Sequence, residues 1–288
     1  AVYVYKRTGS SWAQEAYIKP INTSVVLHFG FDIDLNGDYL AVGAPKEQST
    51  QTTITNGSTA STECCSSSSG AVYIYKRTGG DTWAQEAYLK TTNHSHYLFG
   101  SGVSLDGNTL VVGISGDRSN QTTISKGRYS SADTSLEDAG AVHVFSKVDT
   151  LWTQEAYIKA ANTGSGDEFG RLGLAISDNS IVVGAWMEDS SQNTITNGST
   201  TPSQTSGSTN AINASSYSGA VFVYKRSGTT WSQQAFIKAP NMGANDQFGA
   251  ELDLDNNTLA VGAPFEDSNQ TTITNGSTAR SDDSFEDA

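Results

Sequence analysis

Acidic and amide side chains alternate at two places where the chain is expected to turn. Asp34, Asn36 and Asp38 occupy every second residue of one such stretch, and Asp253 and Asp255 share that spacing further along. Ca²⁺ takes about six to eight oxygen ligands, so carboxylates and amides this close together in a flexible loop suit it. The same residues are typical of a tight hairpin turn, because Asp and Asn tolerate left-handed conformations. The sequence favours the turn and leaves a Ca²⁺ site open.

A second acidic set has the same ambiguity. Asp117, Glu188-Asp189 and Glu266-Asp267 each follow a predicted strand. They could supply cation ligands, but a solvated loop is the interpretation that the sequence favours.

No arrangement typical of an enzyme accompanies these acids. His94 and His96 have the spacing of a metal pair, but no third ligand stands at a useful distance along the chain. The chain contains no nucleophile elbow, phosphate-binding loop or zinc-protease motif. We therefore expect that the protein is not an enzyme and needs no cofactor, apart from a possible Ca²⁺.

The two cysteines, Cys64 and Cys65, are neighbours in the sequence. Adjacent cysteines rarely bond to each other because the small ring strains the peptide between them. Two free thiols, a strained disulfide and a crosslink to another chain are the three possibilities.

The same stretch of about 70 residues occurs four times, over residues 1–70, 71–140, 141–219 and 220–288. A repeat of this length, built of strands and turns, indicates a radial or stacked assembly of small sheets. We treat residues 1–288 as a single repeat domain, or as a segment of a larger one. Both ends of the chain fall at one phase of the repeat, so a closed ring and a longer protein are both open.

Each copy contains four predicted strands. In the first copy these cover residues 1–7, 12–19, 31–35 and 39–44, and Asn36-Gly37 predicts the turn between the last two. Glycines in the fourth strand, such as Gly43, indicate close approach of another backbone. Four tryptophans hold one place in every copy, at Trp12, Trp83, Trp152 and Trp231. Packing between sheets is favoured for them over stacking on sugars.

A polar loop follows each fourth strand. One sequence, Gln-Thr-Thr-Ile-Thr-Asn-Gly-Ser, begins at Gln51 and Gln270, recurs from Gln192 to Ser199 with Asn193 in place of the first Thr, and has a variant that begins at Gln121. The isolated Ile in each copy suggests that the loop is anchored on the sheet. Loops of such length in a compact protein are typically functional.

The order of these motifs resembles the FG-GAP repeat of integrin α-subunit propellers and their microbial relatives. Phe-Gly begins at Phe29, Phe99, Phe169 and Phe248. Gly-Ala-Pro follows in the first and fourth copies, whereas the second and third have Gly113-Ile-Ser115 and Gly184-Ala-Trp186. The resemblance implies an all-β fold, a β-propeller of four-stranded antiparallel blades with the strand after Phe-Gly innermost. The chain would begin with two outer strands and end after two inner strands, so that one blade is shared between its ends.

The resemblance also bears on calcium and on function. In the family some blades bind Ca²⁺ in an Asp-x-Asp/Asn-x-Asp-Gly-x-x-Asp loop; Asp34, Asn36 and Asp38 match its first three ligands, but the rest is missing. The resemblance implies a non-enzymatic extracellular or cell-surface scaffold or adhesion module. Its loops would bind a protein or glycan partner, or further copies of the chain. A lectin-like propeller and a structural unit of a surface filament or sheath are the alternatives.

Acceptor sequences for N-glycans are frequent, which suits an extracellular protein. They begin at Asn22, Asn56, Asn93, Asn120, Asn197, Asn213, Asn256, Asn269 and Asn275.

Charge and hydropathy exclude two kinds of partner. The formal net charge is −13, and phosphate binding requires clustered Lys and Arg, so a nucleic acid is not expected. No apolar run approaches the roughly 18 residues that a membrane span needs.

Overall fold

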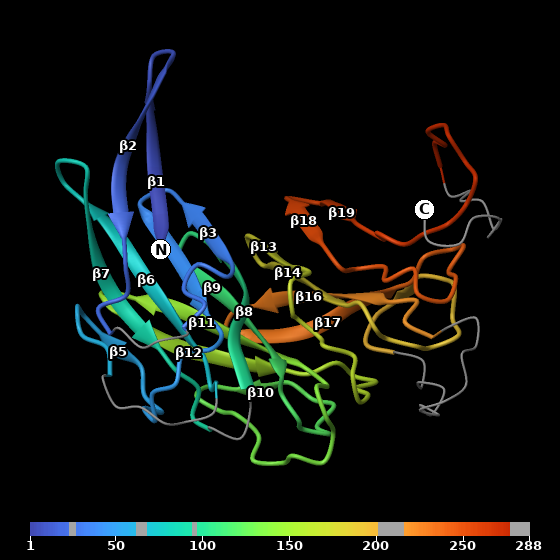
Figure 1. Cartoon of the computed structure of the whole chain (residues 1–288). Coiled ribbons are helices and arrows are strands. Elements are labelled where there is room, and N and C mark those ends of the chain that lie inside the picture. The colour runs from blue at the N-terminus through green and yellow to red at the C-terminus, as the bar shows by residue number, and fades with distance from the viewer. Residues whose placement is uncertain (23–26, 62–67, 94–96, 201–215, 277–288) are drawn as a thin grey trace.

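The structure is a computed structural model of the whole chain, and it describes residues 1–22, 27–61, 68–93, 97–200 and 216–276. These residues form β-strands, turns and loops, with no helix among them. Figure 1 shows the sheets following one another in an open arc, with the first and last hairpins toward its two ends. Within the described residues, no helix is long and apolar enough to cross a membrane.

The strands recur in the order that the sequence predicts. The first outer strands are β1 (Val2–Thr8), β6 (Ala71–Thr78), β11 (Ala141–Val148) and β16 (Ala220–Ser227). The second outer strands, which carry the tryptophans, are β2 (Ser11–Ile18), β7 (Thr82–Leu89), β12 (Leu151–Ile158) and β17 (Thr230–Ile237). The inner hairpins are β3 (Ile33–Asn36) with β4 (Tyr39–Ala44), β8 (Tyr97–Asp106) with β9 (Thr109–Gly116), β13 (Leu174–Ser177) with β14 (Ser180–Ala185), and β18 (Leu252–Asp255) with β19 (Thr258–Val261).

Each complete sheet joins the inner hairpin of one repeat to the outer hairpin of the next. The three sheets have the strand orders β3-β4-β6-β7, β8-β9-β11-β12 and β13-β14-β16-β17, each extended by one short strand, and all pairs are antiparallel. Equivalent residues meet in each: Ala44 lies opposite Ala71, and Ala185 lies opposite Ala220. Each sheet therefore combines strands from two consecutive sequence repeats, as the predicted order of outer and inner strands indicates.

The short strand at the outer edge corrects the prediction of four strands. It is β5 (Thr55–Asn56), β10 (Ser125–Lys126) or β15 (Thr196–Asn197), each drawn from the repeated polar loop. Thr55 and Asn56 pair with Tyr88 and Ala87 of β7. The loop thus covers the otherwise unpaired edge of the second outer strand, an edge that would attract other chains.

The first and last hairpins are two-stranded sheets of their own. β1 pairs with β2, and β18 pairs with β19. In this structure the two hairpins are not hydrogen-bonded to each other, so the blade shared between the chain ends stays a prediction.

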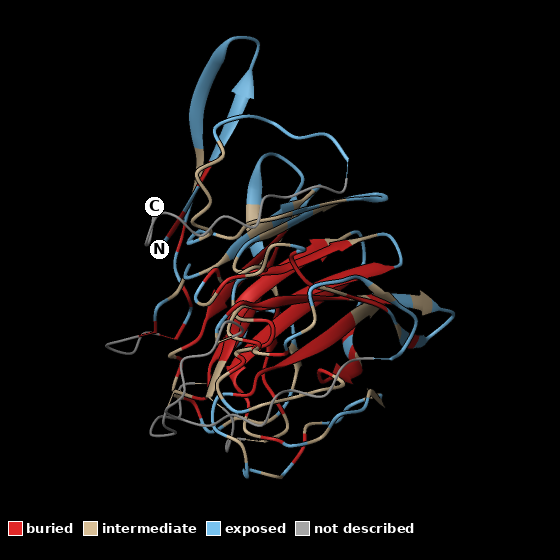
Figure 2. Ribbon diagram, turned by 90° about the vertical axis from the view of Figure 1, so that its right-hand side faces the viewer, coloured by how far each residue is buried: buried red, intermediate tan, exposed pale blue. Residues whose placement is uncertain are grey.

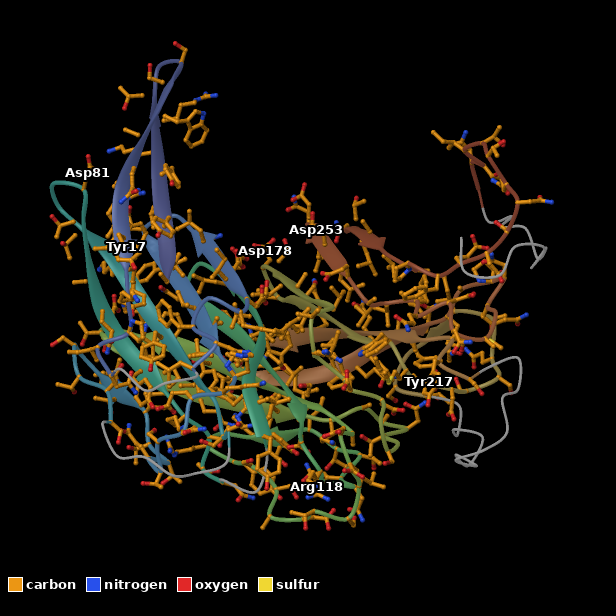
Figure 3. All side chains as sticks on the ribbon, viewed as in Figure 1. Tyr17, Asp81, Arg118, Asp178, Tyr217 and Asp253 are labelled. Atoms are coloured by element: carbon orange, nitrogen blue, oxygen red, sulfur yellow. The ribbon has the colours of Figure 1, made fainter. Side chains whose placement is uncertain are left out.

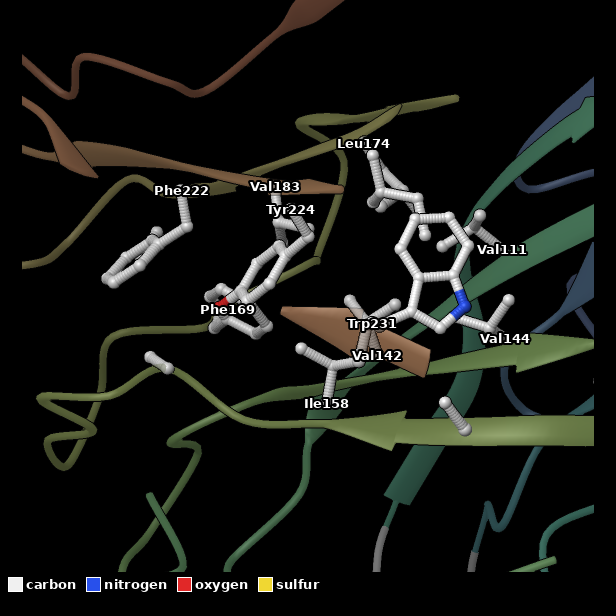
Figure 4. Packing of buried hydrophobic residues seen from close by; sticks show 14 of the residues in the cluster. Val111, Val142, Val144, Ile158, Phe169, Leu174, Val183, Phe222, Tyr224 and Trp231 are labelled. Atoms are coloured by element: carbon white, nitrogen blue, oxygen red, sulfur yellow. The ribbon is translucent and has the colours of Figure 1, made fainter. Parts of the chain in front are cut away.

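The core lies between successive sheets. Alternating Val and aromatic residues give each first outer strand two apolar faces, and both are buried in β6, β11 and the start of β16. One cluster joins the second complete sheet, through Val142 and Val144, to the third, through Phe222, Tyr224 and Trp231 (Figure 4). Figure 2 shows the buried residues gathered in these sheets, with the β1–β2 hairpin projecting into solvent.

The inner hairpin turns lie one residue later than the sequence predicts. Asn36 pairs with Tyr39, so Gly37 and Asp38 form the two-residue turn. The first turn residue has a positive φ, 58° at Gly37 and 53° at both Asp178 and Asn256. Gly, Asp and Asn tolerate this conformation, which explains why these types recur at the turn.

Candidate functional site

The acids of the first inner hairpin bind backbone amides of the next sheet. Asp34 Oδ2 accepts hydrogen bonds from the Leu105 N–H (2.6 Å) and the Ser104 hydroxyl (3.4 Å). Asn36 Oδ1 accepts from the Gly107 N–H at 3.2 Å. These side chains therefore tie β3 to β8, and they use the oxygen atoms that a cation would need.

Hydrogen bonds of the same kind join the later inner strands. Ser104 Oγ accepts from the Ile176 N–H at 3.1 Å, and Asp106 Oδ2 accepts from the Asp178 N–H at 2.6 Å. Ser177 Oγ accepts from the Asn256 N–H at 3.1 Å. Short polar side chains on each inner strand thus hold the next inner strand along the arc.

Burial raises the pKa of the Asp34 carboxyl above its ordinary value. The hydrogen bonds from the Leu105 and Leu35 N–H groups oppose this effect without cancelling it. The pKa of the Asp32 carboxyl is raised in the same way. Burial raises it, and a hydrogen bond from the Val103 N–H, which favours the charged form, opposes this effect. A raised pKa means that ionisation of these carboxyls is disfavoured by the fold.

The other predicted calcium ligands are dispersed. Asp38 lies in the turn, where it contacts Arg77 at 3.4 Å. Asp253 and Asp255 lie exposed on β18, at the far end of the arc. The described part of the chain holds no group of three or more His, Cys, Asp or Glu side chains suited to a metal ion. Calcium binding stays a prediction, and the hydrogen bonds argue against it at Asp34 and Asn36.

Two members of the second acidic set, Asp117 and Glu188, are not solvated, which corrects the sequence interpretation for them; Asp189, Glu266 and Asp267 are half-buried. Asp117 and Glu188 are fully buried, each in an ion pair with a lysine that directly follows a second outer strand. The pairs are Glu47–Lys90 (2.7 Å), Asp117–Lys159 (3.0 Å) and Glu188–Lys238 (2.8 Å). An ammonium of the chain itself thus neutralises each buried acid.

Each buried lysine is held by further acceptors. Lys90 Nζ donates to Ser69 Oγ and to the Gly70 carbonyl, both at 2.7 Å. Burial lowers the pKa of the Lys90 ammonium, and the nearby Glu47 carboxylate partly offsets the effect. Sequence reasoning missed these lysines although their signal is regular, since a Lys ends the tryptophan strand in every copy.

Glycines of the Phe-Gly and Gly-Ala-Pro motifs meet where sheets adjoin. A Cβ atom on Gly43 would overlap the carbonyl oxygen of Gly100 in the next sheet. Gly184 stands in the same relation to Gly249. The predicted close approach of backbones is confirmed, and it explains why the two motifs occur together.

The tryptophans pack between neighbouring sheets. Trp152 and Trp231 are 1% and 3% exposed. The Trp231 indole donates to Glu155 Oε1 at 2.9 Å across a junction, and Trp83 donates to Glu15 Oε1 at 2.7 Å. This geometry supports packing over sugar stacking at the complete sheets.

The polar loops form a separate surface. Figure 3 places Arg118, in the loop after β9, on the side of the arc opposite to Asp178 and Asp253. A glutamine closes each loop: Gln51 Nε2 donates to the Thr53 carbonyl (2.8 Å) and to Thr55 Oγ1 (2.7 Å). The contact recurs at Gln121, Gln192 and Gln270.

The prediction that an isolated Ile anchors each loop on its sheet is confirmed for two of the four loops. Ile54 and Ile124 pack against the core. Ile195 and Ile273 are 60% and 92% exposed, which leaves apolar side chains standing on the loop surface.

The predicted glycan acceptors differ in access. The Asn22 amide is buried and donates to Glu47 Oε1 and to the Ser61 carbonyl. The Asn56 amide accepts from the Trp152 N–H at 2.7 Å in the neighbouring sheet, and Asn93 donates to the Ser131 carbonyl at 2.7 Å. The exposed acceptors are Asn56, Asn120, Asn197, Asn256 and Asn275, whereas Asn93 and Asn269 are half-buried. Asn213, Cys64, Cys65, His94 and His96 lie outside the described residues.

A family model agrees with this arrangement. The model of the FG-GAP repeat matches residues 152–200 and 231–278. Each match runs from a tryptophan strand through an inner hairpin into the loop that follows it. No curated protein is significantly similar to the chain. The all-β sheets, the paired glycine motifs and the family match lead to one conclusion: the chain carries FG-GAP repeats, at residues 152–200 and 231–278.

Proposed function

We propose that the chain is a non-enzymatic propeller module of the cell surface or extracellular space, and that its loop surface binds a protein or glycan partner. FG-GAP repeats are found in adhesion and extracellular proteins, which supports this class of function. The observation that carries the proposal is that recurring residues of the strands and their ends join the sheets, whereas residues of the loops are exposed. The recurring acids, glycines, lysines and tryptophans join the sheets, and the exposed apolar residues Ile195 and Ile273 stand on the loops.

The proposal takes the sheets as blades of a propeller. The chain carries an outer half-blade at its start and an inner half-blade at its end. These halves are complementary in sequence, whether they join within one chain or between copies. The loops that carry β5, β10 and β15 belong to the three complete sheets, whereas the loop with Ile273 follows the last hairpin.

A matched pair of substitutions tests the loop surface. Ile195, on a loop, and Val148, at the turn of an outer hairpin, are both 60% exposed. They lie at opposite ends of the strands, so Ile195→Asp should weaken binding to cells or matrix proteins while Val148→Asp leaves it unchanged. Equal effects of the two variants would contradict recognition by the loops. Binding confined to a glycan array would assign the partner to carbohydrate and favour the lectin.

Calcium enters the proposal as a separate question. The carboxylates of Asp253 and Asp255 are exposed on β18, where Asp255 Oδ1 accepts a hydrogen bond from the Asn256 amide at 2.7 Å. A rise in Tm with added Ca²⁺ that is lost in Asp253→Asn would support a site there. An unchanged Tm would remove calcium from the proposal.

A further inference from the structure

A buried asparagine shares the carboxylate of the Glu47–Lys90 ion pair. Asn22 Nδ2 donates to Glu47 Oε1 at 3.1 Å, and Lys90 Nζ donates to Glu47 Oε2 at 2.7 Å. All three residues are buried: Asn22 is 7% exposed, and Glu47 and Lys90 are each 2% exposed. An amine and a carboxamide, two groups that can condense to a new amide, are thus held on the two oxygens of one carboxylate.

The carbonyl of the same carboxamide faces a phenol. The Tyr73 hydroxyl donates to Asn22 Oδ1, and Tyr73 is fully buried. Burial raises the pKa of this phenol, so the group stays protonated and remains a donor. Asn22 Nδ2 also donates to the Ser61 carbonyl at 2.9 Å. The hydrogen bonds on both sides of the amide group therefore agree on one orientation.

These contacts place the groups that amide formation needs around one atom, Asn22 Cγ. Burial lowers the pKa of the Lys90 ammonium, which raises the share of neutral, nucleophilic amine. Glu47 can take a proton from the amine and pass one to the departing nitrogen. The Tyr73 hydroxyl can stabilise the negative charge that develops on Oδ1 when Cγ is attacked.

The third complete sheet has the same three side chains without the phenol. Asn162 Nδ2 donates to Glu188 Oε1 at 2.7 Å, and Lys238 Nζ donates to Glu188 Oε2 at 2.8 Å. Phe222 has the position in β16 that Tyr73 has in β6. Within the described part of the chain, Asn162 Oδ1 is buried without a hydrogen-bond partner. The third sheet therefore serves as an internal comparison for the Tyr73 hydroxyl.

The second complete sheet differs at two of these places. Asp117, which is one methylene shorter, has the place of Glu47 in the ion pair. His143 has the position in β11 that Tyr73 has in β6. Of the three complete sheets, the first alone combines a glutamate with a phenol.

We propose that Lys90 and Asn22 form an isopeptide crosslink once the first complete sheet has folded. To react, Lys90 Nζ leaves the Ser69 hydroxyl and the Gly70 carbonyl, to which it donates at 2.7 Å. It bonds to Asn22 Cγ, and the Cγ–Nδ2 bond breaks to release ammonia. Of the three ammonium protons, one stays on the new amide, one passes through Glu47 to Nδ2, and one remains on Glu47.

The crosslink needs no oxidant and no second reactant. It replaces a buried pair of opposite charges by neutral groups, which removes the cost of keeping both charges away from water. The new bond joins the segment after β2 to the segment after β7, so it links the first two repeats covalently. This inference goes beyond the loop-surface function and does not depend on it.

Intact-mass spectrometry of the full chain tests the crosslink. The chain is made in a host that does not glycosylate it, then reduced and kept at pH 7 until its mass is constant. Loss of one ammonia should lower the mass by about 17 Da, and a tryptic digest should contain the Lys90 peptide joined to the Asn22 peptide. A mass equal to that of the sequence overturns the proposal. So does a loss of ammonia without joined peptides, because Asn56-Gly57 can lose ammonia by forming a succinimide.

Two tyrosine variants of the first sheet separate the role of the hydroxyl from packing. Tyr73→Phe should fold, because Phe222 fills the equivalent place, and should form the crosslink at least about tenfold more slowly. Tyr88→Phe is the matched control, since its hydroxyl contacts Ser49 at 2.7 Å and not Asn22. It should crosslink at the rate of the unaltered chain. Equal rates in the two variants would overturn the role assigned to the Tyr73 hydroxyl.

The reverse change tests the same chemistry in the third sheet. Phe222→Tyr supplies a hydroxyl to the buried Asn162 Oδ1. A second ammonia should then be lost, lowering the mass by about 34 Da in all, and Lys238 should be joined to Asn162. If this variant folds and crosslinks only its first sheet, the phenol does not decide which sheet reacts, and the mechanism is wrong.

Discussion

The buried ion pair of Asp117 and Lys159 allows a quantitative prediction. Lys159 Nζ lies 3.0 Å from Asp117 Oδ1, and both side chains are 0% exposed. Asp117 also accepts from the Tyr157 hydroxyl (2.9 Å) and the Ser119 N–H (3.0 Å). Lys159→Met keeps much of the side-chain volume but removes the ammonium. Because the carboxylate then stays buried without its counter-ion, the free energy of unfolding should fall by about 3–5 kcal/mol at pH 7.

A double variant separates the loss of the counter-ion from a packing defect. A packing defect would remain when the carboxylate is also removed, whereas an uncompensated charge would not. Asp117→Asn added to Lys159→Met should recover most of the loss at pH 7.

Urea unfolding followed by tryptophan fluorescence at pH 7 measures both effects. Lys6→Met is the control, because Lys6 pairs with Asp81 in an exposed contact, with side chains 45% and 54% exposed. Such an exposed pair contributes little to stability. If Lys159→Met costs no more than Lys6→Met, or if Asp117→Asn recovers none of the loss, the buried pair does not have the role described.

Three further predictions concern the junctions and the surface. Gly43→Ala should destabilise the chain by about 1–3 kcal/mol in urea unfolding, because its methyl meets the Gly100 carbonyl; an unchanged midpoint would contradict that contact. Asp34→Asn should not lower the free energy of unfolding at pH 7, because burial raises the pKa of Asp34 and so disfavours its charged form. Any gain in stability should vanish as the pH falls and the aspartate of the unaltered chain takes up its proton. A gain in stability that grows at low pH would contradict the raised pKa. If the protein is made in a glycosylating host, peptide mapping should find glycan on exposed Asn197 and none on buried Asn22; the reverse pattern would contradict the packing of Asn22.

Much of the fold could be predicted because the local patterns and the long-range contacts agree. The fourth strand of the first copy was expected over residues 39–44, and β4 covers Tyr39–Ala44. Its register with β6 follows from the repeat, since one residue of slip would turn every buried side chain outward. The turn at Gly37 was placed one residue early, because the sequence does not reveal which residue takes the positive φ.

The candidate site could be predicted less well, for a physical reason. The spacing of Asp34 and Asn36 suits a cation, a turn or a neighbouring backbone, and only the position of β8 decides in favour of backbone N–H donors. Thr55 and Asn56 are too short a stretch to signal a strand, and they pair because Tyr88 and Ala87 offer an open edge. The recurrence of Lys90 is visible in the sequence, since a lysine directly follows the tryptophan strand in every copy, and it could have been used to predict a structural role.

Amide hydrogen exchange of β1 and β6 tests the blade arrangement most directly. The two strands are almost identical in sequence, but β6 is paired on both sides, with β4 and β7, whereas among the described residues β1 is paired only with β2. The amides of Val72 and Ile74 should exchange far more slowly than those of Val2 and Val4. Equal protection of the two strands would show that β1 has a second partner strand within one chain, and would contradict the open arc.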